Sequence, residues 1–213
     1  MKQKERPIIF STKMVKAILD GRKTQTRRPI KPQPIKSFTY MPLSTELVGI
    51  GSSEKGWQKC PYGQPGDILW VKETWRLLQV FEDWWYGGWD ADIYLGPIPK
   101  EKPNPKQLAV EYCEETGEDR PWRSPIFMPK WASRIKLEIT GIRVERIQDI
   151  SERDCITEGI TPISTPNITG DEPTLREKFA DLWDSFWAKK GLGWNQNPWV
   201  WVIEFRRMKN ATN

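Results

Sequence analysis

Apolar residues recur at helical spacing in two clear segments of the chain. The first begins after Ser11, whose hydroxyl can cap a helix, and Gly21 is placed to end it. The second begins after Thr174, which can form a capping box with Glu177, and Gly191 is placed to stop it. Each segment has one apolar face, so both predict helices that pack against a core.

Strand patterns occupy three other segments. Residues 68–75, ILWVKETW, combine an apolar run with a charged far end, and residues 198–207, PWVWVIEFRR, predict a buried strand. Residues 134–147, RIKLEITGIRVERI, alternate apolar and polar positions, with Gly141 indicating a bulge between two halves. A short helix over residues 151–159 should follow, capped at its first residue by a serine and ended by a glycine.

The remaining segments predict loops and an insertion. Residues 44–66 are rich in turn-forming residues and predict a loop, whereas residues 80–125 have weak periodicity and predict an insertion with a few short strands. Repeats and an interdomain linker are both lacking. The pattern therefore predicts one α+β domain over residues 1–213, with a core of strands and a few flanking helices.

Composition narrows the class of protein. The 213 residues include 33 Lys and Arg against 28 Asp and Glu, so the net charge of +5 permits an anionic partner without requiring one. The chain lacks a membrane-spanning apolar run and a signal peptide, which predicts a soluble cytoplasmic protein. The three cysteines, Cys60, Cys113 and Cys155, are far apart and fit a reducing compartment.

The chain has no histidine, which restricts the chemistry available to it. Imidazole acid–base catalysis and His-based metal sites are excluded, and without clustered cysteines a zinc site is not expected. No organic cofactor is indicated either. Catalysis would have to use Lys, Thr, Ser, Tyr, Cys or carboxylates.

The stretch GRKTQTRRP, residues 21–29, concentrates such groups directly after the first predicted helix. Neighbouring arginines and burial would both favour a neutral Lys23, which could act as a base toward the Thr26 hydroxyl if the chain turns there. The residues alone favour a solvated basic loop, then phosphate binding, and only then catalysis.

Two carboxylates are candidate partners for this stretch. Glu73 lies at the end of the predicted strand 68–75, and Glu158 lies at the end of the short helix. Because the dipole at a helix C-terminus prefers cations, a carboxylate there suggests another use for Glu158. An exposed charge is the simpler interpretation of each, and Cys155 in the same helix is more typical of a core residue than of a nucleophile.

The 13 tryptophans fall into groups with different expected roles. Core packing is predicted where they follow the apolar periodicity of the last helix and strand, at Trp183, Trp187, Trp199 and Trp201. A stacking wall for a flat ligand is a further interpretation of those in the acidic, glycine-bearing insertion, Trp84, Trp85 and Trp89.

Several of these segments together resemble the ASCH domain family. The resemblance rests on FSTKMVKAILDGRKTQTRRP, GDILWVKETW, MPKWASRIKLEITGIRVERIQDIS and ERDCITEGI, which span both ends of the chain and much of its middle. It implies a β-barrel related to the RNA-binding PUA fold, with flanking helices. Relative to the shortest members, residues 38–56 and 80–125 are probable insertions, as in longer members from phage and prophage genomes.

The resemblance implies an activity and a set of residues. A short bacterial member of the family is an amidohydrolase that removes the acyl group from the exocyclic amine of N4-acylated cytidine. Its catalytic lysine, threonine and glutamate correspond to Lys23, Thr26 and Glu158, and a further arginine corresponds to Arg28. Arg27 departs from the family pattern, in which this position is apolar.

The expected substrate is therefore a small nucleoside or base derivative. Arg28, Glu73, Trp75 and Trp85 are the residues expected to contact it. Two alternatives remain open: a non-catalytic RNA-binding module that uses the basic residues of 21–29 as phosphate contacts, and a ribonuclease that uses the lysine and carboxylate pair. The sequence does not indicate an oligomeric state.

Overall fold

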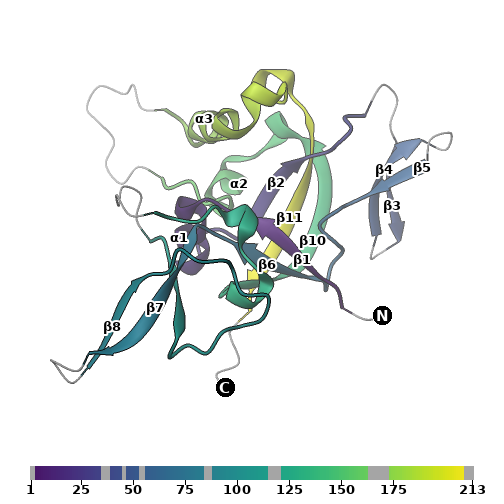
Figure 1. Ribbon diagram of the computed structural model, residues 1–213. Coiled ribbons are helices and arrows are strands. Elements are labelled where there is room, and N and C mark those ends of the chain that lie inside the picture. The colour runs from purple at the N-terminus through teal and green to yellow at the C-terminus, as the bar shows by residue number, and fades with distance from the viewer. Residues whose placement is uncertain are drawn as a thin grey trace.

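The computed structural model describes residues 3–34, 39–44, 47–52, 56–83, 88–114, 121–162 and 173–208. It has the expected mixed α+β architecture. In Figure 1 one main sheet occupies the centre, three α-helices gather on one side of it, and two small sheets extend away from it.

The main sheet contains five strands in the order β1-β6-β10-β11-β2. Strands β1 and β6 pair in parallel and the other neighbours are antiparallel. The bounds are β1 Glu5–Ile9, β2 Gln25–Pro29, β6 Ile68–Lys72, β10 Lys136–Arg146 and β11 Trp199–Arg207.

The predicted closed barrel is not seen among the described strands, because β1 and β2 form the two edges of the sheet. A side chain nevertheless links these edges: the Arg28 guanidinium of β2 donates to the main-chain carbonyl of Ile9 in β1. Figure 1 also shows that β10 and β11 curve strongly. The sheet thus bends so that its edge strands β1 and β2 approach each other. A side chain links these two strands, and they are not paired in a ladder of main-chain hydrogen bonds.

The bulge predicted at Gly141 is confirmed. The register of β10 against β11 shifts between Ile139 and Gly141, so that Ile139 pairs with Phe205 while Gly141 pairs with Glu204. One extra residue on β10 increases the local bend of the strand pair. The pattern over residues 134–147 therefore predicted both the strand and its irregularity.

The apolar residues of the sheet divide between two clusters. One packs against helix α1 (Thr12–Leu19) and contains Trp201, and the other packs under helices α2 (Glu152–Thr157) and α3 (Leu175–Trp187). Cys155 is fully buried in the second cluster, as its predicted core role requires.

The three predicted helices are present with their predicted caps. Ser151 accepts a hydrogen bond from the Asp154 amide at the start of α2, and Thr174 and Glu177 form the capping box of α3. Ser11 stands at the N-cap of α1, but its side chain makes no capping hydrogen bond. Position alone therefore predicted the first helix start, whereas cap chemistry predicted the other two.

Replacing Thr174 with alanine should lower the free energy of unfolding by about 1 kcal/mol, because it removes the capping hydrogen bond to the Glu177 amide. Urea denaturation followed by tryptophan fluorescence would measure the loss. Ser11→Ala is the matched control and should change stability by less than about 0.5 kcal/mol, since that hydroxyl caps nothing. Equal losses in the two variants would contradict the assignment.

The two predicted insertions carry sheets of their own. The first sheet contains β3 Thr39–Ser44, β4 Leu47–Ser52 and β5 Gly56–Lys59 in sequence order, and β5 extends beyond the predicted insertion at 38–56. The expected loop over residues 44–66 was therefore wrong for these strands and is confirmed over residues 60–66. The second sheet has the order β8-β7-β9, with bounds β7 Trp75–Asp83, β8 Gly88–Ile93 and β9 Leu108–Tyr112.

Single-turn 3-10 helices complete the described elements. They are η1 Pro125–Phe127, η2 Lys130–Ala132, η3 Ile147–Asp149, η4 Ala188–Lys190 and η5 Trp194–Gln196. No helix in the described part of the chain is both long and apolar enough to cross a membrane.

Candidate active site

A tight reversal after α1 brings the basic stretch against the end of α2. Gly21 adopts a φ of 76°, and the main-chain amide of Lys23 then donates to the Ala17 carbonyl. The next amide, that of Thr24, donates to the Thr157 carbonyl at 2.9 Å. Because α1, α2 and the start of β2 are joined by these main-chain bonds, residues 23 and 158 meet although they are distant in sequence.

Gly159 makes this close packing possible. Its φ of 94° is left-handed, and a Cβ there would lie 3.0 Å from the Ala17 Cβ and 3.3 Å from the Lys23 Cβ. Glycine at the end of α2 is therefore needed both for the backbone conformation and for contact with α1.

Lys23 and Glu158 form a buried ion pair. The Lys23 Nζ donates to the Glu158 carboxylate at 2.7 Å and to the Glu158 main-chain carbonyl at 2.7 Å. The side chain of Lys23 is 0% exposed and that of Glu158 is 4% exposed. Burial lowers the pKa of Lys23 below its usual 10.5, and the Glu158 carboxylate opposes part of that shift. The pair is thus shielded from bulk water.

Thr26 reaches the same site from β2. It is buried, and it lines a cleft of about 260 Å³ together with Glu158 and Arg28. Lys23 is not among the residues that line this cleft, and none of the hydrogen bonds among the described residues joins Lys23 to Thr26. Thr26 and Glu158 therefore both contribute to the lining of the cleft, whereas Lys23 contacts Glu158 without lining it.

Arg28 lines the cleft and links β2 to β1. Its guanidinium donates to the Ile9 carbonyl and lies 5.2 Å from the centre of the Phe10 ring. The Arg28 Nε is buried without a hydrogen-bond partner. Burial lowers the pKa of Arg28, and Tyr62 and Glu158 partly oppose the shift. Arg28 is thus a desolvated cation with unused donor capacity at the cleft.

The wall opposite β2 is apolar and comes from α3. The residues of α3 that line the cleft are Phe179, Leu182, Trp183, Phe186 and Trp187. The sequence assigned the tryptophans of this stripe to the core, which is confirmed for Trp183, whose exposed fraction is 4%. The same stripe also forms the cleft wall, and the 40% exposed Phe186 marks the part of it that the core does not cover.

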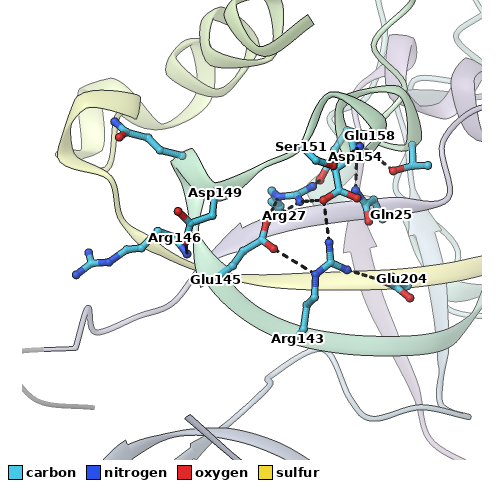
Figure 2. Close-up of polar contacts among 12 residues, drawn as sticks. Gln25, Arg27, Arg143, Glu145, Arg146, Asp149, Ser151, Asp154, Glu158 and Glu204 are labelled. Atoms are coloured by element: carbon cyan, nitrogen blue, oxygen red, sulfur yellow. Dashed lines mark hydrogen bonds and ion pairs between the residues drawn. The ribbon is translucent and has the colours of Figure 1, made fainter. Parts of the chain in front are cut away.

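Arg27 points to the other face of β2 and contacts three carboxylates, as Figure 2 shows. Its guanidinium lies 2.6 Å from Glu145, 2.9 Å from Asp154 and 3.1 Å from Glu158. Burial alone would lower the pKa of Arg27, but these carboxylates, Glu158 first, outweigh it and raise the pKa. Arg143 extends the network by bonding Glu145, Asp154 and Glu204.

Both carboxylate oxygens of Glu158 are therefore engaged by cations. Lys23 contacts Oε2, while Arg27 contacts Oε1. The sequence identified Arg27 only as a departure from an apolar family position, yet the structure makes it a direct partner of Glu158. The available signal in the sequence was a charged residue between two buried positions of a strand. The carboxylate partners of Arg27 come from distant segments of the chain.

A second, larger cleft adjoins the first. It has a volume of about 620 Å³ and shares Ser11, Met14, Glu158, Leu182 and Phe186 with the smaller cleft. Its own lining includes Thr74 and Thr161. Glu158 thus stands where the two clefts meet.

The other expected substrate contacts lie elsewhere. Glu73 is buried and accepts two hydrogen bonds from Arg134, at 3.1 and 3.0 Å, and burial raises its pKa against the effect of that arginine. Trp75 is fully buried and packs edge-on against Trp131, so its expected role in substrate contact is not supported by its position. Trp85 lies outside the described residues.

Metal ligands are not clustered in the part of the chain that the structure describes: no three or more His, Cys, Asp or Glu side chains gather there in a group that could hold an ion. Comparisons of the chain with protein-family models, with curated proteins and with solved structures each returned no match.

Proposed function

We propose that the protein is an amidohydrolase that removes the acyl group from the exocyclic amine of N4-acylated cytidine or a related cytosine derivative. The observation that carries the proposal is the buried Lys23–Glu158 pair, whose glutamate lines an aromatic-walled cleft together with Thr26. Perturbed, paired titratable groups at a cleft are typical of acid–base sites.

The reaction divides into two steps in this proposal. Neutral Lys23 takes the proton of Thr26 as its Oγ1 attacks the acyl carbon, and then returns that proton to the departing cytosine amine. A water molecule next attacks the acyl-threonine ester and gives one proton to Lys23. As the ester C–O bond breaks, Lys23 returns that proton to the Thr26 Oγ1, which releases the carboxylic acid and restores the free hydroxyl and the neutral amine. Glu158 positions Lys23 throughout. In the alternative, the Lys23–Glu158 pair activates water directly and no ester forms.

Arg28 and the α3 wall supply binding in the same proposal. The desolvated Arg28 guanidinium would stabilise the oxyanion, a contribution typically worth about 3–4 kcal/mol. The pyrimidine ring would stack against the α3 aromatics, and such stacking is worth about 1–3 kcal/mol for each base.

A family and a fold are part of the same proposal. We assign the chain to the ASCH domain family with a PUA-like β-barrel, of which the curved five-stranded sheet would be the barrel wall. The arginine contact between β1 and β2 supports this assignment because it links the two strands that a barrel would bring together. The two three-stranded sheets correspond to the proposed insertions.

Burial argues against the RNA-binding alternative. Binding of RNA phosphates requires accessible cations. The side chains of Lys23 and Arg27 are 0% exposed and already form ion pairs with Glu158. An RNA-binding module would also gain nothing from a buried Lys23–Glu158 ion pair. Incubation of the purified protein with intact RNA and with acylated cytidine would separate a ribonuclease from an amidohydrolase by their products.

Replacing Thr26 with valine should lower kcat by at least about 100-fold on N4-acetylcytidine, since the isosteric side chain lacks the attacking oxygen. Thr26→Ser is the matched variant and should retain measurable activity. Adding hydroxylamine should divert the wild-type acyl-enzyme to acetohydroxamate, which a colorimetric assay detects. A Thr26→Val enzyme with undiminished turnover would exclude Thr26 as the nucleophile and favour direct attack by water.

A further inference from the structure

The charges that line the two clefts are unbalanced. Apart from Glu158 and Arg27, which is already paired with three carboxylates, each charged side chain in their linings is a cation, namely Lys13, Arg28, Lys178 and Lys190. Glu158 itself is neutralised by Lys23 and Arg27. The clefts should therefore hold a positive potential that attracts an anionic ligand.

We propose that the substrate carries a phosphate group on its ribose, bound at the mouth of the smaller cleft by Lys190 beside Trp187. This inference rests on the proposed function, because it names the class of substrate for that site. It makes the substrate a nucleotide rather than a neutral nucleoside or free base.

Two ammonium groups meet at one aromatic ring there. The Lys190 Nζ lies 4.4 Å from the centre of the Trp187 ring, and the Lys31 Nζ lies 5.2 Å from the same ring. Since Trp187 and Lys190 both line the cleft that contains Thr26, a base directed toward Thr26 would extend its sugar toward these cations. A phosphate on that sugar would then lie within reach of the Lys190 ammonium, whose charge attracts it.

Lys190 also has its charge available. Within the ranges that the structure describes, ion pairs do not use Lys190, Lys13 or Lys178, whereas they do use the buried cations Lys23 and Arg27. The lysines at the mouths of the clefts are thus distinct from the buried cations, Lys23 and Arg27, which form ion pairs within the site. Aromatic side chains that stack bases beside lysines that contact phosphates are the usual combination at single-stranded nucleic-acid sites.

The phosphate could belong to a mononucleotide or to a nucleotide within a chain. Lys178 and Lys190 are separated by twelve positions, about 18 Å along α3 and its last turn at 1.5 Å per residue, and they line different clefts. A single phosphate can contact only one of these ends. A dependence on Lys178 as well as Lys190 would therefore indicate a chain that runs through both clefts.

The test compares substrates that differ only in phosphate: N4-acetylcytidine, its 5′-monophosphate, and a short oligoribonucleotide with one N4-acetylcytidine. In the wild type, kcat/KM should be about tenfold higher for the monophosphate than for the nucleoside, and added salt should reduce that ratio. Lys190→Glu should bring the ratio to about one. Lys189→Glu, at the exposed neighbouring position that lines neither cleft, should keep it.

Binding gives a readout that does not require turnover. Quenching of tryptophan fluorescence should show tighter binding of cytidine 5′-monophosphate than of cytidine, with the difference lost in Lys190→Glu. Equal affinity and equal kcat/KM for phosphorylated and unphosphorylated ligands would overturn this inference while leaving the amidohydrolase intact. A phosphate-dependent affinity without deacylation of any substrate would support the phosphate subsite and refute the proposed reaction.

Discussion

Replacing Arg27 with methionine should lower the free energy of unfolding by about 3 kcal/mol. The guanidinium is fully buried among three carboxylates, and its removal leaves their charges less compensated in a low-dielectric setting. We expect the lower end of the range for broken buried pairs, because Glu158 keeps Lys23 and the other two carboxylates keep Arg143. Guanidinium denaturation followed by tryptophan fluorescence would measure the loss.

Arg143→Met is the matched control for this variant. Arg143 contacts two of the same carboxylates but has a side chain that is 31% exposed, so water can replace it. The loss there should be below about 1 kcal/mol, as for other solvent-accessible ion pairs. If the two variants lost equal stability, burial would not be what makes Arg27 important.

Replacing Lys23 with methionine, or Glu158 with glutamine, should lower kcat on N4-acetylcytidine by about 10²- to 10⁴-fold, the range typical of a general acid–base group. The two residues act on one proton in the proposed reaction. The double variant should therefore lose little more than the worse single variant, as expected for residues that work as a unit. Fully additive losses would indicate separate roles.

The pH dependence of kcat/KM tests which form of Lys23 is active. If the neutral amine is the base, activity should rise with pH along a limb that ends below the usual lysine pKa of 10.5, because burial lowers the pKa of Lys23. Glu158 raises that pKa, so the residual activity of Glu158→Gln should rise at a lower pH than in the wild type. Thr26→Ser should keep the wild-type limb, since it changes no charge. A limb that moves upward in Glu158→Gln would contradict the assignment of Lys23 as base.

The sequence predicted the two residues of the buried pair without predicting how they meet. A carboxylate at the C-terminus of a short helix was locally unfavourable, and Glu158 indeed forms its contacts outside the helix. The basic stretch after the first helix indicated Lys23, and the family resemblance pointed to both residues. The contact itself depends on Gly21, Gly159 and main-chain bonds between α1, α2 and β2, and these depend on tertiary packing rather than on local pattern.

The features that the sequence analysis missed or predicted wrongly also depend on tertiary packing. Arg27 has partners 118, 127 and 131 positions away, so spacing could not show that this arginine is buried and paired. Trp75 begins a strand whose partners come from the insertion, and those partners bury it. The segment after residue 44 is rich in glycine and serine, which lowers strand propensity, but antiparallel pairing with neighbouring segments makes it a sheet.

The packing of Gly159 has a consequence for engineering the protein. Any side chain at this position would push against the helix before the basic stretch and against the lysine that holds the proton. A library that varies the lining of the cleft should therefore keep position 159 fixed. A loss of activity after substitution at position 159 would reflect displacement of Lys23 rather than an altered fit to the substrate.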